Sequence, residues 1–157
     1  MRVGLGQDSH RFQTDITKPL ILGGVEFEDK LSLQGNSDAD VILHALCNGI
    51  SGVTGVNILG KISDDLCAEG ITDSSMYVKE ALKYLQDWQV CHVSFSIECK
   101  VPKITPKIME MKQNISELLG LQTQNIGITA TSGEELTAFG CGQGIQVFCI
   151  VTVGNDL

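Results

Sequence analysis

Hydrophobic and polar residues alternate along several segments of the chain, as is typical of half-buried β-strands. Over residues 1–9 the alternation puts Gly4, Gly6 and Asp8 on one face and three larger side chains on the other. Other segments share the alternation or are rich in Val, Ile and Phe. The predicted strands cover residues 1–9, 19–27 as two short pieces around a glycine turn, 90–98, 125–131 and 143–153.

Apolar residues recur at helical spacing in three other segments. We expect a first helix over about residues 38–53, with Ser37 as its N-cap. A second helix should start at Asp73 or Ser74 and end near Trp88. A third should follow Pro106 and stop at Gly120. Residues 54–72 show no clear period and are expected to form a long connection.

The interleaved strands and helices predict an α+β or α/β sheet with helices covering one of its faces. The 157 residues fit a single domain over residues 1–157. At this length roughly 70% of the unfolded surface can be buried on folding, so no metal or disulfide is needed to build a core. A metal site in this chain is therefore expected to serve function.

The net charge of −8 argues against a nucleic-acid binder, because the 11 Lys and Arg are scattered and outnumbered by 19 Asp and Glu. A small phosphate ligand would need local positive charge from a metal ion, a helix N-terminus or a few lysines. The six cysteines form no CxxC pair, and no signal peptide precedes them. We expect reduced, mostly buried cysteines in a cytoplasmic protein without a membrane span.

Asp8, His10 and His44 are the candidate metal ligands. Asp8 and His10 are two residues apart on a predicted strand, so their side chains point the same way. If the first helix packs against the end of that strand, His44 completes a triad. Two His and one carboxylate leave a fourth position open, as in catalytic zinc sites. From the residues alone, the alternative is that Asp8 closes a turn and His44 is a core histidine. His92 lies mid-strand without an acidic neighbour and reads as ordinary structure.

The segment Thr131-Ser132-Gly133-Glu134 runs from a strand into a predicted short helical turn. Its hydroxyls and backbone N–H groups would suit a phosphate, and Glu134 could hold a second cation. The alternative is a capping box, with Thr131 as the cap and Glu134 three residues on. Both interpretations are compatible. The alternating Gly140, Gly142 and Gly144 permit close backbone approach, for example between subunits.

Taken together, these motifs resemble the 2-C-methyl-D-erythritol 2,4-cyclodiphosphate synthase family over nearly the whole chain. The residues that carry the resemblance are Gly6-Gln7-Asp8-Ser9-His10, Asn36-Ser37-Asp38-Ala39-Asp40 with His44, Gly60-Lys61, Pro102-Lys103 and Ala130-Thr131-Ser132-Gly133-Glu134. The resemblance makes the metal triad the preferred interpretation of Asp8, His10 and His44. It also implies a ferredoxin-like mixed sheet and a homotrimer with active sites between subunits.

The resemblance implies one reaction, in non-mevalonate isoprenoid biosynthesis. The 2-phosphate of 4-diphosphocytidyl-2-C-methyl-D-erythritol 2-phosphate attacks the β-phosphorus of the same molecule, and CMP leaves. Zn²⁺ on Asp8, His10 and His44 would contact the β-phosphate, and Mg²⁺ or Mn²⁺ near Glu134 would bridge the two phosphates. Catalytic roles fall to Asn36 and Ser132. The implied substrate-binding residues are Asp8, Ser9, His10, Asn36, Ser37, Leu59, Gly60, Asp65, Cys99, Lys100, Val101, Pro102, Lys103, Ile104, Thr105, Thr131, Ser132, Gly133 and Glu134.

The chain departs from the family pattern around the triad. Asn36 stands where the family has His, and Ile58-Leu59 replace a ribose-binding Asp. Ser63-Asp64 replace an aromatic–proline pair, Glu135 replaces Lys, and Cys141 replaces Arg. These changes remove positive charge. They keep two alternatives open: a non-catalytic homologue that binds metal and phosphate, and a metal-dependent phosphohydrolase in which water attacks.

Overall fold

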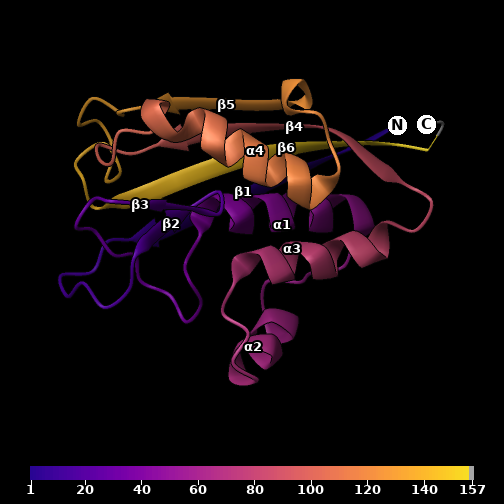
Figure 1. The fold of residues 1–157 in the computed structure, drawn as a ribbon, viewed down its shortest axis with the longest axis horizontal. Helices are drawn as coiled ribbons and strands as arrows, with labels where there is room; N and C mark the ends of the chain where they lie inside the picture. Colours follow the sequence, from indigo (N-terminus) through magenta and orange to yellow (C-terminus); the bar gives the residue numbers. More distant parts are fainter. Residues whose placement is uncertain (156–157) are drawn as a thin grey trace.

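The computed structural model describes residues 1–155. Its centre is a four-stranded mixed sheet with the strand order β1-β6-β4-β5 (Figure 1). The strands are β1 (Arg2–Arg11), β4 (Gln89–Glu98), β5 (Ile126–Thr131) and β6 (Gly144–Gly154). β6 is antiparallel to both β1 and β4, whereas β4 and β5 are parallel. A separate hairpin pairs β2 (Leu20–Leu22) with β3 (Val25–Phe27) around Gly23-Gly24, as predicted.

The mixed sheet was predicted, but its ferredoxin-like connection order was wrong. A ferredoxin-like fold runs β-α-β-β-α-β. Here the sheet strands and the helices that pack on them run β1, α1 (Val41–Thr54), β4, α4 (Ile108–Leu119), β5, β6. α4 is the crossover between parallel neighbours β4 and β5, because parallel strands cannot be joined by a tight hairpin. β6 then returns between β1 and β4.

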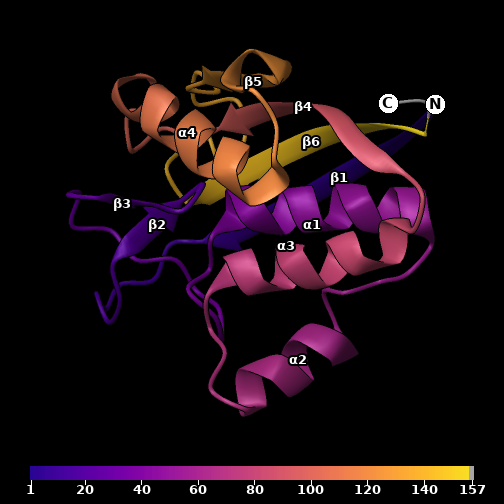
Figure 2. The ribbon, with the colours of Figure 1, turned by 45° about the vertical axis from the view of Figure 1, so that its right-hand side comes forward.

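The helices that contact the sheet cover one of its faces. α1 packs on β1 and β6, and α4 packs on β5. α3 (Ser74–Leu82), followed by a 3-10 turn at Lys83–Leu85, packs against α1 on the side away from the sheet (Figure 2). The opposite face of the sheet is open, and it exposes Val3, Leu5, Phe148 and Ile150. One buried apolar cluster between the sheet and the helices forms the core.

Two glycines of β1 let α1 lie directly on the strand. A Cβ at Gly4 would lie 2.1 Å from the carbonyl oxygen of Gly49. A Cβ at Gly6 would lie 2.3 Å from the backbone nitrogen of the same residue. Real side chains do not approach backbone atoms this closely. The glycine face predicted from the alternation over residues 1–9 is therefore the contact surface for α1.

The first helix begins later than predicted, and Ser37 is not its N-cap. Asp40 is the cap, and its carboxylate accepts a hydrogen bond from the backbone N–H of Leu43 at 3.1 Å. Ser37 instead accepts from the N–H of Ala39 at 3.1 Å, and Ala39 has a left-handed φ of 58°. This turn cannot continue into a helix, so α1 starts at Val41.

The connection predicted over residues 54–72 contains a helix, α2 (Lys61–Ala68). None of its residues is fully buried, although Ile62 and Leu66 pack against the core one turn apart. With only eight residues, the helix is too short for this pattern to show a clear period. Its start is held by Ser63, whose hydroxyl accepts from the N–H of Gly60 at 3.0 Å. α2 lies apart from the sheet, beyond α3 (Figure 2).

The structure also tests the predictions about cysteines and membrane spans. All six cysteines are free thiols, and Cys47, Cys99 and Cys149 are buried. Burial is thus less general than the sequence suggested, because Cys67, Cys91 and Cys141 reach the surface. Within residues 1–155, none of the helices has the length and apolar character needed to cross a membrane.

Candidate active site

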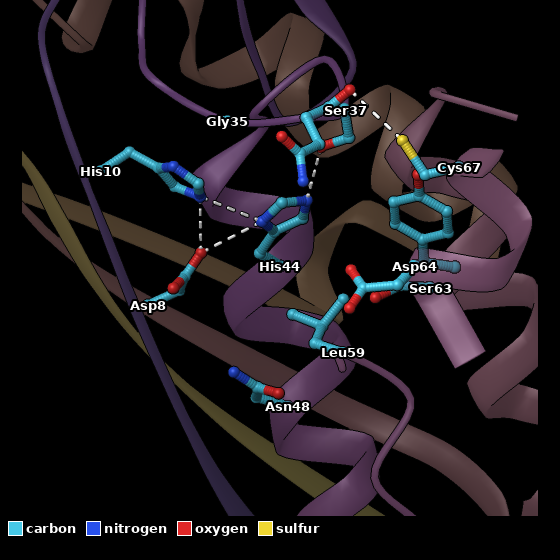
Figure 3. A pocket seen from close by; sticks show the side chains of 12 residues that line it. Asp8, His10, Gly35, Ser37, His44, Asn48, Leu59, Ser63, Asp64 and Cys67 are labelled. Carbon is cyan, nitrogen blue, oxygen red and sulfur yellow. Dashed lines mark hydrogen bonds and ion pairs between the residues drawn. The ribbon is translucent and has the colours of Figure 1, made fainter. Parts of the chain in front are cut away.

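Asp8, His10 and His44 meet where the C-terminal half of β1 faces the first turn of α1 (Figure 3). The Oδ2 atom of Asp8 lies 2.9 Å from Nε2 of His10 and 3.1 Å from Nδ1 of His44. The two imidazole nitrogens are 3.1 Å apart. His44 is the fourth residue of α1, one turn into the helix. The packing of α1 on β1 thus brings together the three residues that the sequence singled out.

The protonation of this cluster is shifted by its own contacts. Burial opposes ionisation of Asp8, but hydrogen bonds with His10 and His44 outweigh it and lower the pKa of that carboxyl from 3.8 to about 2. Burial also opposes protonation of His10, yet the hydrogen bond to Asp8 raises its pKa above 6.5. On its other side, Nδ1–H of His10 donates to the carbonyl oxygen of Gln34 at 2.6 Å, which leaves Nε2 facing the cluster.

The donor set fits a divalent cation. Two imidazole nitrogens and one carboxylate oxygen converge, and their lone pairs repel one another unless a proton or a cation lies between them. Zinc bonds of about 2.0–2.1 Å would put two tetrahedral ligands roughly 3.3 Å apart. The separations of 2.9 to 3.1 Å need only a small expansion to reach that value. The cluster can therefore hold zinc with one position open to a ligand.

Asp40 and Lys18 fix the backbone around this cluster. The carboxylate of Asp40 accepts from the N–H groups of Gly23 at 2.9 Å and Gly24 at 2.7 Å, as well as capping α1. It thereby joins the β2–β3 turn to the start of the helix that bears His44. The ammonium of Lys18 donates to the carbonyl oxygens of Gly35 at 2.6 Å and Ser37 at 2.8 Å. These contacts hold the segment that carries Asn36.

A pocket of about 270 Å³ opens over the three ligands, and Asn36, Ser37 and Leu59 line it, as the resemblance implied. Its lining also includes residues that the sequence did not single out as site residues: Asn48, Ser63, Asp64, Cys67 and Tyr77 (Figure 3). Asn48 follows His44 by four residues, so helical spacing could have placed it on the same face. The others come from α2 and α3, whose positions the sequence did not reveal.

Three residues assigned to this side of the substrate do not line the pocket. Ser9 lies between Asp8 and His10 on β1, so strand alternation turns it to the opposite face. Gly60 is the N-cap of α2. Asp65 is exposed on α2 and forms an ion pair with Lys61 at 2.7 Å, while its neighbour Asp64 lines the pocket instead.

A second pocket of about 370 Å³ lies where β4 and β5 end. Most of the segment from Cys99 to Thr105 lines it, together with Thr131 and Ser132 from the other strand. Val101 is exposed and does not line it. The segment after β4 and the hydroxyls at the end of β5 thus line one pocket.

The loop after β5 is not the helical turn or the capping box that the sequence suggested. Thr131 accepts from the N–H of Gly133 at 3.4 Å, and Ser132 accepts from that of Glu134 at 3.3 Å. Glu134 and Glu135 both have left-handed φ angles, of 47° and 62°, which end any helix. Glu134 is exposed and lies outside the cluster formed by the three metal ligands. Its role at a second cation stays a prediction.

The loop has its own supports. Glu98 at the end of β4 accepts a hydrogen bond from the Thr137 hydroxyl. A Cβ at Gly133 would lie 2.5 Å from a carboxylate oxygen of the same glutamate. Glu135, which the resemblance places at a position usually held by Lys, forms an ion pair with Lys100 at 2.7 Å.

The two pockets lie at opposite edges of the sheet. Asp8 and His10 are on edge strand β1, and Thr131 ends edge strand β5. β1, β4 and β5 run in the same direction, so both pockets lie toward the same end of the sheet. Three strand spacings of roughly 4.8 Å separate the edge strands by about 14 Å.

Known proteins resemble this chain over nearly its full length. The model of the YgbB family matches residues 1–154. A protein of Chlamydia caviae named 2-C-methyl-D-erythritol 2,4-cyclodiphosphate synthase is 51% identical over 157 residues, covering 98% of this chain and 89% of that protein. A Chlamydia trachomatis protein of the same name is 49% identical over 155 residues, covering 97% of this chain and 87% of its own length.

Solved structures show the same fold. The synthase of the same name from Plasmodium vivax superposes with a TM-score of 0.82 at 26% identity, covering 99% of both chains. The Plasmodium falciparum IspF protein, in a complex with CDP, has a TM-score of 0.82 at 26% identity, covering 97% of this chain and 94% of that one. The family model and the close relatives agree with the resemblance found in the sequence. The chain therefore belongs to the YgbB family.

Proposed function

We propose that this protein converts 4-diphosphocytidyl-2-C-methyl-D-erythritol 2-phosphate to 2-C-methyl-D-erythritol 2,4-cyclodiphosphate and CMP. An oxygen of the 2-phosphate forms a bond to the β-phosphorus. The bond from that phosphorus to the oxygen bridging to the α-phosphorus breaks, and the electron pair leaves with CMP. The observation that carries the proposal is the Asp8–His10–His44 cluster at the floor of a pocket, in a chain 51% identical to a synthase of that name.

The residues of the first pocket would position and neutralise the reacting phosphates. Phosphoryl transfer of this kind depends more on positioning and charge than on covalent catalysis. Asp8, His10 and His44 would hold Zn²⁺, which supplies positive charge to a phosphoryl oxygen. Asn36 lines the same pocket, and its amide can donate to a phosphate without the charge of a histidine.

The second pocket would bind the cytidine end of the substrate. Lys100 and Lys103 line it beside the hydroxyls of Thr131 and Ser132. The Plasmodium falciparum relative, of the same fold, is solved as a CDP complex. Ser132 would hold a phosphate from this side, and Glu134 would hold Mg²⁺ or Mn²⁺ against the phosphates.

A homotrimer would join these two half-sites. The substrate carries both a nucleotide and a reacting phosphate, yet the two pockets lie at opposite edges of one sheet. Packing the β1 edge of one chain beside the β5 edge of the next would place the triad next to a neighbour's nucleotide pocket. Such a head-to-tail contact forms a ring where the rotation between neighbouring chains brings the last chain back to the first. The exposed apolar residues of the open sheet face supply the surface, since Leu5 and Ile150 are direct neighbours across β1 and β6.

We place the activity in the cytoplasm, since six free thiols suit a reducing compartment. Purified protein with Zn²⁺, Mg²⁺ and the linear substrate tests the activity. Cyclic diphosphate and CMP in equal amounts are the expected products. Linear hydrolysis products would indicate a phosphohydrolase instead, and tight binding without any product would indicate a non-catalytic homologue.

A further inference from the structure

His44 has a second partner on the side of its ring away from Asp8. Its Nε2 atom lies 2.8 Å from the hydroxyl oxygen of Ser74, the first residue of α3. Ser74 is completely buried. Its hydroxyl also contacts a carboxylate oxygen of Asp38, and its backbone N–H donates to the other carboxylate oxygen at 3.0 Å. An imidazole, a hydroxyl and a carboxylate thus form a continuous chain leading away from the metal triad.

The position of Nδ1 determines which group donates and which accepts in each of these hydrogen bonds. That atom faces Asp8 and His10, so it must carry a lone pair when it binds a cation. The proton of neutral His44 then resides on Nε2 and is donated to the Ser74 hydroxyl. That hydroxyl has one proton of its own, which it donates to Asp38, because an ionised carboxylate only accepts. Each group has a single consistent role.

The Asp38 carboxylate, at the end of this series of hydrogen bonds, is itself held in place. Asp38 accepts from the backbone N–H of Asp40 at 3.0 Å, and its own N–H donates to the carbonyl oxygen of Thr72 at 2.9 Å. Ser37 is the other hydroxyl near Nε2 of His44, but it lies farther away, at 3.3 Å, and it already accepts from Ala39. Ser74 is therefore the main acceptor for His44.

We propose that Ser74 and Asp38 are positioning residues that hold His44 with Nδ1 unprotonated and aimed at the metal. This inference rests on the proposed function in one respect, since it requires that the triad binds a cation. Partners of this kind orient a ligating histidine and increase its basicity, and their loss typically lowers metal affinity roughly 10- to 100-fold. In Ser74→Ala, Nε2–H loses its main acceptor, and only the more distant Ser37 hydroxyl remains near it. The tautomer protonated on Nδ1, which donates to Asp8, then competes with metal binding.

The test compares the zinc affinities of wild type, Ser74→Ala and Ser75→Ala by chelator competition. Ser75 is the matched control, because it is the next residue of α3 and is not fully buried. We expect one tightly bound zinc in wild type and in Ser75→Ala. We expect zinc to bind roughly 10- to 100-fold more weakly to Ser74→Ala. In zinc-loaded wild type, NMR should show a slowly exchanging Nε2–H proton on His44, which should exchange fast in Ser74→Ala.

A merely structural role for Ser74 would give a different pattern. The variant would be less stable without metal, but its folded form would bind zinc as wild type does, and this would overturn the inference alone. Wild-type protein without zinc affinity would overturn the proposed metal centre and the inference together. Should Ser74→Ala not fold, Asp38→Asn keeps the size of the side chain and removes its charge. Wild-type affinity and slow Nε2–H exchange in Asp38→Asn would also contradict the inference.

Discussion

Gly6 on β1 and Ala45 on α1 approach each other so closely that a Cβ at Gly6 would lie 2.0 Å from the carbonyl oxygen of Ala45. Gly6 precedes Asp8 by two residues, and Ala45 directly follows His44. The absence of one side chain therefore sets the distance between two of the three candidate metal ligands. Packing of the core and geometry of the site depend on the same contact.

We predict that Gly6→Ala weakens both folding and metal binding. The added methyl must push α1 away from β1, and overpacking of this kind costs about 1–3 kcal/mol. The same shift would separate His44 from Asp8, so zinc affinity should fall. Urea unfolding and chelator competition measure the two effects. Gly52→Ala is the control: its Cβ would meet nothing closer than 3.4 Å, and alanine favours a helix by up to about 1 kcal/mol.

His44→Ala should abolish zinc retention and cyclisation while the fold survives. Two ligands remain in this variant, which is too few for a stable site. Elemental mass spectrometry of the purified protein measures the metal, and circular dichroism checks the fold. His92→Ala is the control, since His92 is an exposed strand residue. Unchanged zinc content in His44→Ala would show that the triad is not the metal site.

The metal-free protein should lose stability in acid through Asp8. Folding lowers the pKa of Asp8 from 3.8 to about 2. The ionised carboxylate therefore adds to the free energy of unfolding above pH 3.8, and this contribution is lost as the pH falls toward 2. The loss should be roughly 2 kcal/mol. His10 has the opposite pH dependence because its pKa is raised on folding. Its contribution to the free energy of unfolding is present below pH 6.5 and is lost as the pH rises through the raised pKa.

Urea unfolding of the metal-free protein across this pH range measures both effects. Asp8→Asn should flatten the pH dependence of the free energy of unfolding at both acidic and near-neutral pH. The substitution removes the Asp8 carboxylate, which is also the charge partner of His10. Asp87→Asn, at an exposed turn, should leave the wild-type profile intact. A profile for Asp8→Asn that followed wild type would mean that Asp8 and His10 do not interact in solution.

The open face of the sheet should determine the oligomeric state. Leu5→Glu places a charge in the middle of the apolar patch, where it would be desolvated in the trimer but solvated in the monomer. Leu5 is 63% exposed in the single chain, so the fold itself should tolerate the change. Sedimentation should show a trimer for wild type and a monomer for the variant. Met109→Glu, at an equally exposed residue of α4, should remain trimeric; dissociation there too would argue against a role for the sheet face.

The sequence predicted the elements whose patterns come from burial. Alternation revealed the strands, and the period of α1, α3 and α4 revealed those helices. α2 was not predicted because it has only eight residues, and its two apolar contacts with the core, at Ile62 and Leu66, are too few to show a period. The error at Ser37 had a different cause, since the left-handed turn at Ala39 separates Ser37 from the helix and leaves Asp40 as the cap.

The site was predictable only as far as it is local. The spacing of Asp8 and His10 could be read from one strand, and His44 was proposed on the condition that the predicted helix packs against that strand. The family pattern then made the triad the preferred interpretation. Ser74 could not be found in this way, because its partners Asp38 and His44 are 36 and 30 residues away in the chain. The ferredoxin-like order came from the resemblance, and it fails because two strands, β5 and β6, follow the last helix along the chain, as the predicted ranges already had it. Only the insertion of β6 between β1 and β4 depends on long-range packing.

The separation of the two pockets also has a genetic consequence. In the proposed homotrimer, chains that carry His44→Ala would lack only the metal half of a site, and chains that carry Ser132→Ala would lack only the nucleotide half. Neither homotrimer would contain an intact site. In a mixed ring, one metal half from the second kind of chain would meet one nucleotide half from the first. Two inactive alleles expressed together should thus complement each other and restore part of the activity.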